Sequence, residues 1–244
     1  MFRGLKKKLR RFSLRRLGLW EGISFGRVSY AQEGEDVLLW RIIGRQRKEP
    51  GVYIEVGSNH PWKCSNTAFF YQLGWKGVAI DPNPDFAALF ARERPRDVFL
   101  NVGVGDEAGE LLYHRFTESL FNTFSVEQAA ALAARGISQA GTPVPVEIMR
   151  LRDALARIWP EGKKIDLLSI DAEGMDECVI RGHDFERYPA DNVIVEFDYP
   201  VLEPGREPPV VAMLRDRDYV FVAKLFKSAL FMHRSEARRM GMIS

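Results

Sequence analysis

The sequence has only two cysteines, no long apolar run and no internal repeat, and each scarcity excludes a class of protein. Cys64 and Cys178 lie far apart and outside any CxxC pattern, which argues against a zinc knuckle or a disulfide scaffold. Reduced thiols of this kind are typical of a cytosolic protein. No stretch approaches ~18 uninterrupted apolar residues, so we expect no segment that spans a bilayer.

Acidic residues are missing from the first twenty positions, although the chain as a whole has 33 Asp or Glu against 35 Lys or Arg. Eight of the basic residues lie in this leader, so the rest of the chain is acidic. Apolar residues recur at helical spacing between them, at Phe2, Leu5, Leu9 and Phe12. We therefore interpret residues 1–28 as a basic amphipathic extension that docks to a membrane surface or a partner. A solvated arm, or a helix packed on its own domain, is the alternative.

The leader lacks the continuous apolar core and the small-residue cleavage site of a secretory signal. We therefore expect a cytoplasmic protein, held at the inner face of the membrane if the leader binds lipid. The acidic body argues against a nucleic-acid partner.

Residues 29–244 alternate between short apolar strands and amphipathic helices, which predicts an α/β fold with a mostly parallel central sheet and helices on both faces. The predicted parallel strands span residues 52–57, 77–81, 98–102, 165–171 and 192–197. The main predicted helices span residues 66–73, 86–92, 151–158, 175–180 and 210–215. Strands at 219–223 and 229–233 are close enough to form a C-terminal antiparallel hairpin. Residues 111–149 interrupt this rhythm and are interpreted as an insertion.

Acidic side chains lie at the end of every predicted parallel strand. In an open parallel sheet the ligand binds beyond the carboxyl ends of the strands. The residues at these ends are Glu55, Gly57, Ser58 and Asn59, then Asp81, then Gly105 and Asp106, then Asp171 and Glu173, and finally Glu196 and Asp198. No GxGxxG motif follows the first strand, which disfavours a dinucleotide.

A nucleoside without phosphate suits these acids better. Asp81 can accept hydrogen bonds from both ribose hydroxyls, and Gly57 lets the backbone approach a ligand closely. S-adenosylmethionine is such a ligand, because its sulfonium cation is favoured by acidic surroundings. For Asp81 alone, a helix cap before Pro82 is the alternative.

Seven short motifs follow one another between residues 29 and 198. They are YAQEGED at 30–36, EVGSNHP at 55–61, SNT at 65–67, FFY at 69–71, GWKG at 74–77, PNP at 82–84 and IDAEG at 170–174. In this order they resemble the motifs of the FkbM-type methyltransferases, with alanine at position 172 where valine is frequent. The resemblance implies a Rossmann-like class I methyltransferase fold. It also implies S-adenosylmethionine-dependent methyl transfer to hydroxyls of sugars, glycans or polyketides.

The resemblance also assigns roles to individual residues. It implies that Glu55, Gly57, Ser58 and Asn59 line the methionine and ribose side of the cofactor. Asp81 would bind ribose, and Gly105 with Asp106 would lie near adenine.

A sugar hydroxyl is almost wholly protonated at neutral pH, so methyl transfer to it benefits from a positioned base. The candidate bases are Asp171, Glu173 and His60. For His60 the alternative is an ordinary loop histidine stacked against Trp62.

A divalent cation is a further hypothesis. Asp171, Glu196 and Asp198 could hold Mg²⁺ at adjacent strand ends, where the ion would acidify the acceptor hydroxyl. The alternative is that Glu173 and Glu196 cap helices and pair with Arg or Lys.

The interruption at 111–149 falls between the third and fourth parallel strands, at the ligand-facing end, and is interpreted as an acceptor-side lid. Ser119, Asn122 and Thr123 would supply its hydrogen-bonding groups, or serve as turn residues. Together with the family resemblance, these features predict an S-adenosylmethionine-dependent O-methyltransferase that acts on a hydroxyl of a sugar, a glycan or a related natural product. The alternative is a catalytically silent module of the same fold that docks to a glycan-synthesis complex or a membrane surface.

Overall fold

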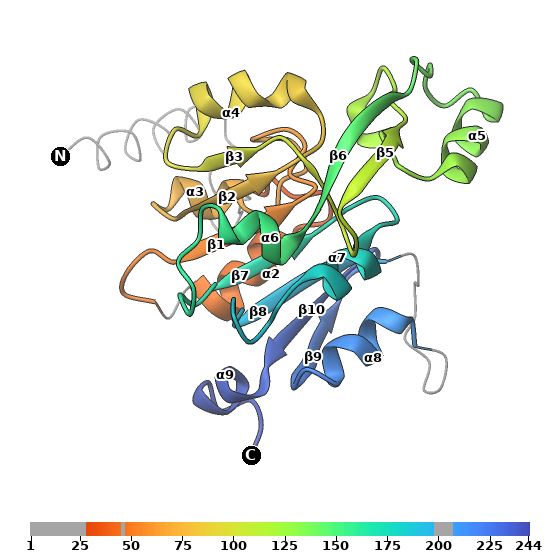
Figure 1. The fold of residues 1–244 in the computed structure, drawn as a ribbon. Coiled ribbons are helices and arrows are strands. Elements are labelled where there is room, and N and C mark those ends of the chain that lie inside the picture. The colour runs from red at the N-terminus through yellow and green to blue at the C-terminus, as the bar shows by residue number, and fades with distance from the viewer. Residues whose placement is uncertain (1–27, 45–46, 198–206) are drawn as a thin grey trace, which may run out of the picture.

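The computed structural model describes residues 28–44, 47–197 and 207–244 (Figure 1). The basic extension predicted for residues 1–28 lies outside the described residues, except for its last position. Asp198 and residues 199–206 also lie outside.

A seven-stranded sheet forms the centre of the fold, and its strand order is β3-β2-β1-β7-β8-β10-β9. The first five strands pair in parallel, whereas β10 is antiparallel to both β8 and β9. In this order the strands are Val98–Leu100, Lys76–Ile80, Val52–Val56, Leu167–Ile170, Asn192–Glu196, Ser228–His233 and Tyr219–Lys224. The predicted mostly parallel sheet and its antiparallel C-terminal hairpin are therefore confirmed.

Helices cover both faces of this sheet, which explains why the strands read as apolar runs rather than alternating patterns. They are α2 (Glu35–Leu39) with the π-helix η1 (Trp40–Gly44), α3 (Ala68–Gln72), η2 (Pro84–Phe86), α4 (Ala87–Glu93), α6 (Leu151–Ala156), α7 (Asp176–Gly182), α8 (Pro209–Arg215) and α9 (Arg234–Arg239). Successive residues of β1 face opposite sides: Tyr53 packs in a core cluster with Leu39 and Phe70, and Ile54 in another cluster with Leu155. Both clusters exclude water from the sheet.

The insertion pairs with β4 in a second, three-stranded sheet of order β4-β6-β5. Figure 1 shows β5 and α5 standing to one side of the central sheet. The strand β4 (Gly103–Gly105) precedes the insertion, whose elements are β5 (Gly109–Tyr113), η3 (Ser119–Phe121), α5 (Val126–Ala134) and β6 (Val144–Arg150). Ser125 caps α5 by accepting a hydrogen bond from the Gln128 amide at 3.1 Å.

Two details differ from the predicted elements. The apolar run at 98–102 ends as a strand at Leu100, and β4 then begins at Gly103 in the other sheet. The side chain of Asn101 donates to the Asp81 carbonyl at 2.9 Å, at the point where the chain leaves the central sheet. Helix α9 was not predicted.

None of the helices in the described parts of the chain is both long and apolar enough to cross a membrane.

Candidate functional site

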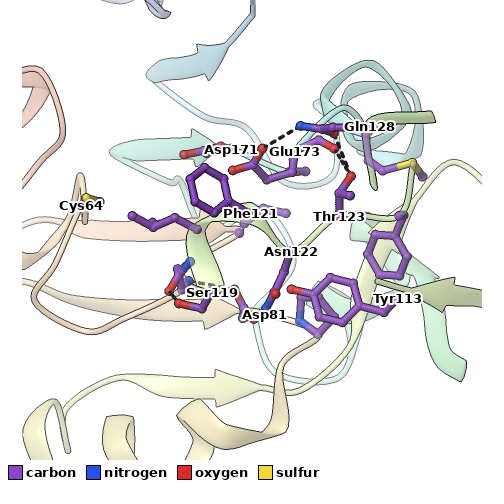
Figure 2. Close-up of a pocket in the computed structure, with 18 of the residues that line it drawn as sticks. Cys64, Asp81, Tyr113, Ser119, Phe121, Asn122, Thr123, Gln128, Asp171 and Glu173 are labelled. Atoms are coloured by element: carbon purple, nitrogen blue, oxygen red, sulfur yellow. Dashed lines mark hydrogen bonds between the residues drawn. The ribbon is translucent and has the colours of Figure 1, made fainter. Parts of the chain in front are cut away.

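A cavity of about 420 Å³ opens at the carboxyl ends of β1, β2 and β7, where the insertion covers it (Figure 2). Its sheet-side lining includes Gly57, Asn59, Asp81, Asp171 and Glu173. Its insertion-side lining includes Tyr113, Ser119, Asn122, Thr123 and Gln128. The structure thus brings five of the predicted site residues together at the predicted edge of the sheet.

Asp81 is held in one orientation at the end of β2. Its Oδ2 accepts a hydrogen bond from the Asn59 amide and its Oδ1 accepts one from the Asn83 amide, both at 2.8 Å. The residue is only 4% exposed. Burial raises the pKa of Asp81 to about 6, against the two backbone hydrogen bonds that lower it. At neutral pH the carboxylate is therefore charged, oriented and open to hydroxyl donors from the cavity.

Asn59 connects the loop after β1 to the insertion. Its φ of 45° is in the left-handed region, which asparagine tolerates better than most residues. Its Oδ1 accepts a hydrogen bond from the Ser119 hydroxyl at 3.0 Å. This contact holds η3 over the mouth of the cavity.

Gly57 is required by the close approach of two chain segments. Its φ is 76°, and a Cβ at this position would lie 1.6 Å from the carbonyl oxygen of Asp171. The glycine therefore allows β1 and β7 to turn past each other at the cavity. The neighbouring Ser58 is buried and does not line the cavity, and its hydroxyl has no partner in the described part of the chain.

Asp171 is paired with a second carboxyl group. Burial, together with a hydrogen bond to Glu196, raises the pKa of Asp171 well above its ordinary value. Burial raises the pKa of Glu196. The hydrogen bond from Asp171 and the ammonium of Lys227, which lies 3.0 Å away, outweigh burial and lower the pKa of Glu196. Of the two carboxyl groups, Asp171 is therefore the one whose protonated form is favoured. The second oxygen of Asp171, Oδ1, is buried without a hydrogen-bond partner among the described residues.

Glu173 has a pKa close to neutrality. Burial, and then the nearby charge of Glu196, raise the pKa of Glu173 to about 7. Its φ of 47° is unusual for a residue with a side chain, and such strain is found at functional sites. Gln128 of α5 donates to Glu173 at 3.5 Å, and Thr123 donates to Gln128 at 2.8 Å. The insertion thus reaches a carboxyl group whose pKa is close to neutral.

Glu55 and His60 lie outside the lining of the cavity. Glu55 is buried beside Arg94, with 3.6 Å between Oε2 and the guanidinium, and it accepts a hydrogen bond from Thr67 at 2.5 Å. His60 Nδ1 accepts from the backbone amides of Trp62 and Lys63. Burial, followed by the charge of Lys63, lowers the pKa of His60. These contacts give Glu55 and His60 structural partners, and their predicted roles at the cofactor and the acceptor stay predictions.

Gly105 and Asp106 also lie outside the lining. Gly105 ends β4, and its carbonyl lies only 2.1 Å from where a Cβ of Gly182 would be. Asp106 pairs with Arg181 of α7 at 2.9 Å. The adenine role predicted for both residues is untested.

Gln32 and Lys227 also line the cavity, although the sequence assigned neither of them a role there. The segment 29–36, here called the strap, carries Gln32 and is hydrogen-bonded to Lys227. Tyr30 accepts at its carbonyl from the Ser65 amide at 3.0 Å, and Glu33 accepts from the Lys227 amide at 2.9 Å. Residues almost two hundred positions apart cannot be paired from one sequence.

The ligand set proposed for Mg²⁺ is not assembled by the described residues. Within residues 28–44, 47–197 and 207–244, no group of three or more His, Cys, Asp or Glu side chains is arranged to hold a metal ion. Asp171 is hydrogen-bonded to Glu196, and Glu196 also pairs with Lys227. Asp198 lies outside the described residues, and the metal hypothesis gains no support.

Comparison with known proteins decides the family. The model of the methyltransferase FkbM domain matches residues 55–221, which is more than half of the chain. The chain belongs to the FkbM methyltransferase family. The resemblance to this family and the predicted methyltransferase fold are therefore confirmed. In this family member the central sheet has the strand order β3-β2-β1-β7-β8-β10-β9.

Individual relatives are more distant. The methyltransferase sdnD of Sordaria araneosa is 38% identical over 84 residues, and this match spans 31% of the chain and 31% of that relative. Among solved structures, a 1,6-didemethyltoxoflavin-N1-methyltransferase of Burkholderia thailandensis is 14% identical with a TM-score of 0.41, covering 91% of this chain and 87% of that chain. A TehB-like methyltransferase of Corynebacterium glutamicum is 11% identical with a TM-score of 0.42, covering 91% and 98%.

Proposed function

We propose that this FkbM family member is an S-adenosylmethionine-dependent O-methyltransferase that acts on a hydroxyl of a sugar, a glycan or a related natural product. The observation that carries the proposal is the position of Asp81 and Glu173 in one cavity. One carboxylate is oriented to accept hydrogen bonds, and the other has a pKa near neutrality.

The cavity has the chemistry that the cofactor requires. Each oxygen of Asp81 accepts one backbone amide and retains lone pairs for a ribose hydroxyl. The nearby side chains of Ile80, Val102 and Val104 offer an apolar wall for an adenine ring. When bound, S-adenosylmethionine supplies an electrophilic methyl group.

Glu173 is the residue that we assign to proton removal. A general base works best with a pKa near the operating pH, and Glu173 meets this condition at about 7. Asp171 is less suited, because burial and its hydrogen bond with Glu196 favour its protonated form. Gln128 orients the Glu173 carboxylate, so that a hydroxyl in the cavity can transfer its proton to the free oxygen.

The cofactor assignment is tested by titrating S-adenosylmethionine into the Asp81→Ala variant in a calorimeter. Loss of hydrogen bonds to a charged acceptor should weaken binding by ~1 to 3 kcal/mol, or roughly 5- to 150-fold. Asp85→Ala is the matched control, because Asp85 is an exposed residue of η2 that pairs with Arg115 outside the cavity. An unchanged dissociation constant for Asp81→Ala would remove the cofactor from this cavity.

The acceptor class is tested by mass spectrometry of glycans and small metabolites from a deletion strain. The proposal expects a glycan or natural product to lose one methyl group on an oxygen. Loss of a methyl group from nitrogen or carbon only would contradict O-methyl transfer.

A further inference from the structure

The two sides of the cavity differ in how their apolar side chains are used. Ile80, Val102 and Val104 on the sheet side belong to the main core cluster. On the insertion side, Leu120, Phe121, Leu132 and Ile137 line the same cavity but belong to no core cluster of the described residues. Their apolar surface is therefore available to something inside the cavity.

None of these four side chains is fully buried, and Phe121 and Leu132 are half-buried. Leu120 is 36% exposed and Ile137 is 41% exposed. Figure 2 shows the ring of Phe121 pointing into the cavity that Asp171 and Glu173 also line. Apolar surface of this kind, beside convergent polar groups, is typical of a small-molecule site.

A cation lies on the same wall. Arg135 follows α5 and lines the cavity with Leu132 and Ile137. Its guanidinium makes no ion pair or side-chain hydrogen bond within the described parts of the chain. An arginine left unpaired at the edge of an apolar wall is suited to a carboxylate, sulfate or phosphate.

We propose that the insertion-side wall is the acceptor subsite, and that the acceptor is an amphipathic molecule with an apolar surface next to its hydroxyl and an anionic group within reach of Arg135. This inference rests on the proposed function only in calling the bound molecule the acceptor of the methyl group. The apolar wall and the cation are features of the cavity itself. A free, uncharged sugar would leave both without a partner.

The test uses anilinonaphthalene sulfonate, an apolar anion whose fluorescence rises on binding, with the full-length protein in saturating S-adenosylhomocysteine. The wild type should bind the probe, and the Leu132→Ser/Ile137→Ser variant should bind it roughly tenfold more weakly. Leu112→Ser is the matched control, because Leu112 belongs to the same insertion and is 56% exposed but does not line the cavity. Equal urea midpoints for the three proteins would show that the substitutions leave the fold intact.

A second experiment isolates the contribution of the Arg135 charge to probe binding. Phenylnaphthylamine has the same rings without the sulfonate, so Arg135→Gln should weaken binding of the sulfonate ~3- to 5-fold and leave the neutral probe within twofold. The proposal is overturned if the wild type does not bind the sulfonate, if Leu132→Ser/Ile137→Ser binds as the wild type does, or if S-adenosylhomocysteine displaces the probe. Failure of the proposed function would show separately, as no heat on titration with S-adenosylhomocysteine alone.

Discussion

Asp171 and Glu173 are two residues apart, yet their surroundings shift their pKa values in different ways. Burial and a hydrogen bond with Glu196 raise the pKa of Asp171 well above its ordinary value, whereas Glu173 faces the cavity with a pKa of about 7. Sequence inspection alone offered both as bases. The hydrogen bond between Asp171 and Glu196 separates them, and it becomes visible only when β7 and β8 are placed side by side.

The ionisation of Glu173 predicts the pH dependence of the enzyme. A general base acts in its deprotonated form, so kcat/KM should fall about tenfold per pH unit below pH 7 and level off above it. Glu173→Gln should lose turnover by ~10² to 10⁴-fold while binding S-adenosylhomocysteine as the wild type does. A methyl-transfer assay across pH 5 to 9, with roughly half-unit steps, measures both effects.

The control for this prediction is Glu177→Gln, because Glu177 pairs with Arg181 on α7 and does not line the main cavity. Wild-type turnover in Glu173→Gln would exclude Glu173 as the base.

Strand geometry explains which of the predicted residues reach the cavity. Side chains along a strand alternate between faces, so Glu55 lies on the same face of β1 as Tyr53, where Arg94 meets both. The acid at a strand end could be predicted from the sequence, but its partner could not. A fully buried arginine such as Arg94 is rare, and no local sequence pattern predicts it.

At the scale of elements, Arg94 ties α4 to the loop between β1 and α3. Its guanidinium donates to the Pro61 carbonyl at 3.3 Å and to Thr67 at 2.7 Å, and it pairs with Asp97 at 2.7 Å. Glu55 completes the network. These contacts of Arg94 thus hold in place the loop that carries Asn59.

Replacing Arg94 by methionine should lower the free energy of unfolding by ~3 to 5 kcal/mol, because Glu55 and Asp97 would stay buried without their cation. Urea unfolding followed by circular dichroism measures the change. Arg92→Met, on the exposed face of the same helix, should change the free energy by about 0.5 kcal/mol or less. A loss below ~1 kcal/mol for Arg94→Met would show that the network contributes little.

Gly57 and Gly136 provide a second comparison between elements. Both have positive φ, but a Cβ at Gly136 meets nothing within 4 Å, whereas one at Gly57 collides with the Asp171 carbonyl. Gly136→Ala should therefore cost about 1 kcal/mol from backbone strain alone. Gly57→Ala should cost clearly more and should separate β1 from β7 near the cavity. Equal melting temperatures for the two variants would contradict this account.

The bounds of most elements could be predicted to within a few residues, because short apolar runs such as those at 52–57, 77–81 and 192–197 are typical of buried strands. The exceptions have physical causes. The run at 98–102 contains the turn at Asn101, and its apolar character continues because β4 is buried in the second sheet. Helix α9 is short and rich in arginine, so it lacks an apolar stripe.

At the scale of the whole molecule, charge divides the chain into a basic leader and an acidic body. The acids of the body that line the cavity suit a cationic cofactor, whereas the leader lies outside the region matched by the family model. This division leads to a prediction about the leader that is independent of methyl transfer.

Deleting residues 1–20 should spare binding of S-adenosylmethionine and weaken association with vesicles that contain anionic phospholipid. The reason is the loss of eight basic residues interleaved with an apolar stripe. Vesicle co-sedimentation of the full-length and truncated proteins measures the effect, with neutral vesicles as the control. Loss of cofactor binding on truncation would instead make the leader part of the fold.

The strap has a consequence for how the protein is made. Glu33 and Glu35 are synthesised almost two hundred residues before their partners Lys227 and Ser228. At ~5 to 20 residues per second, the strap waits roughly 10 to 40 seconds for the turn that it joins. The lining of the cavity is therefore complete only after residue 227 has been made, and a nascent chain arrested before that residue carries every acid of the cavity but lacks Lys227.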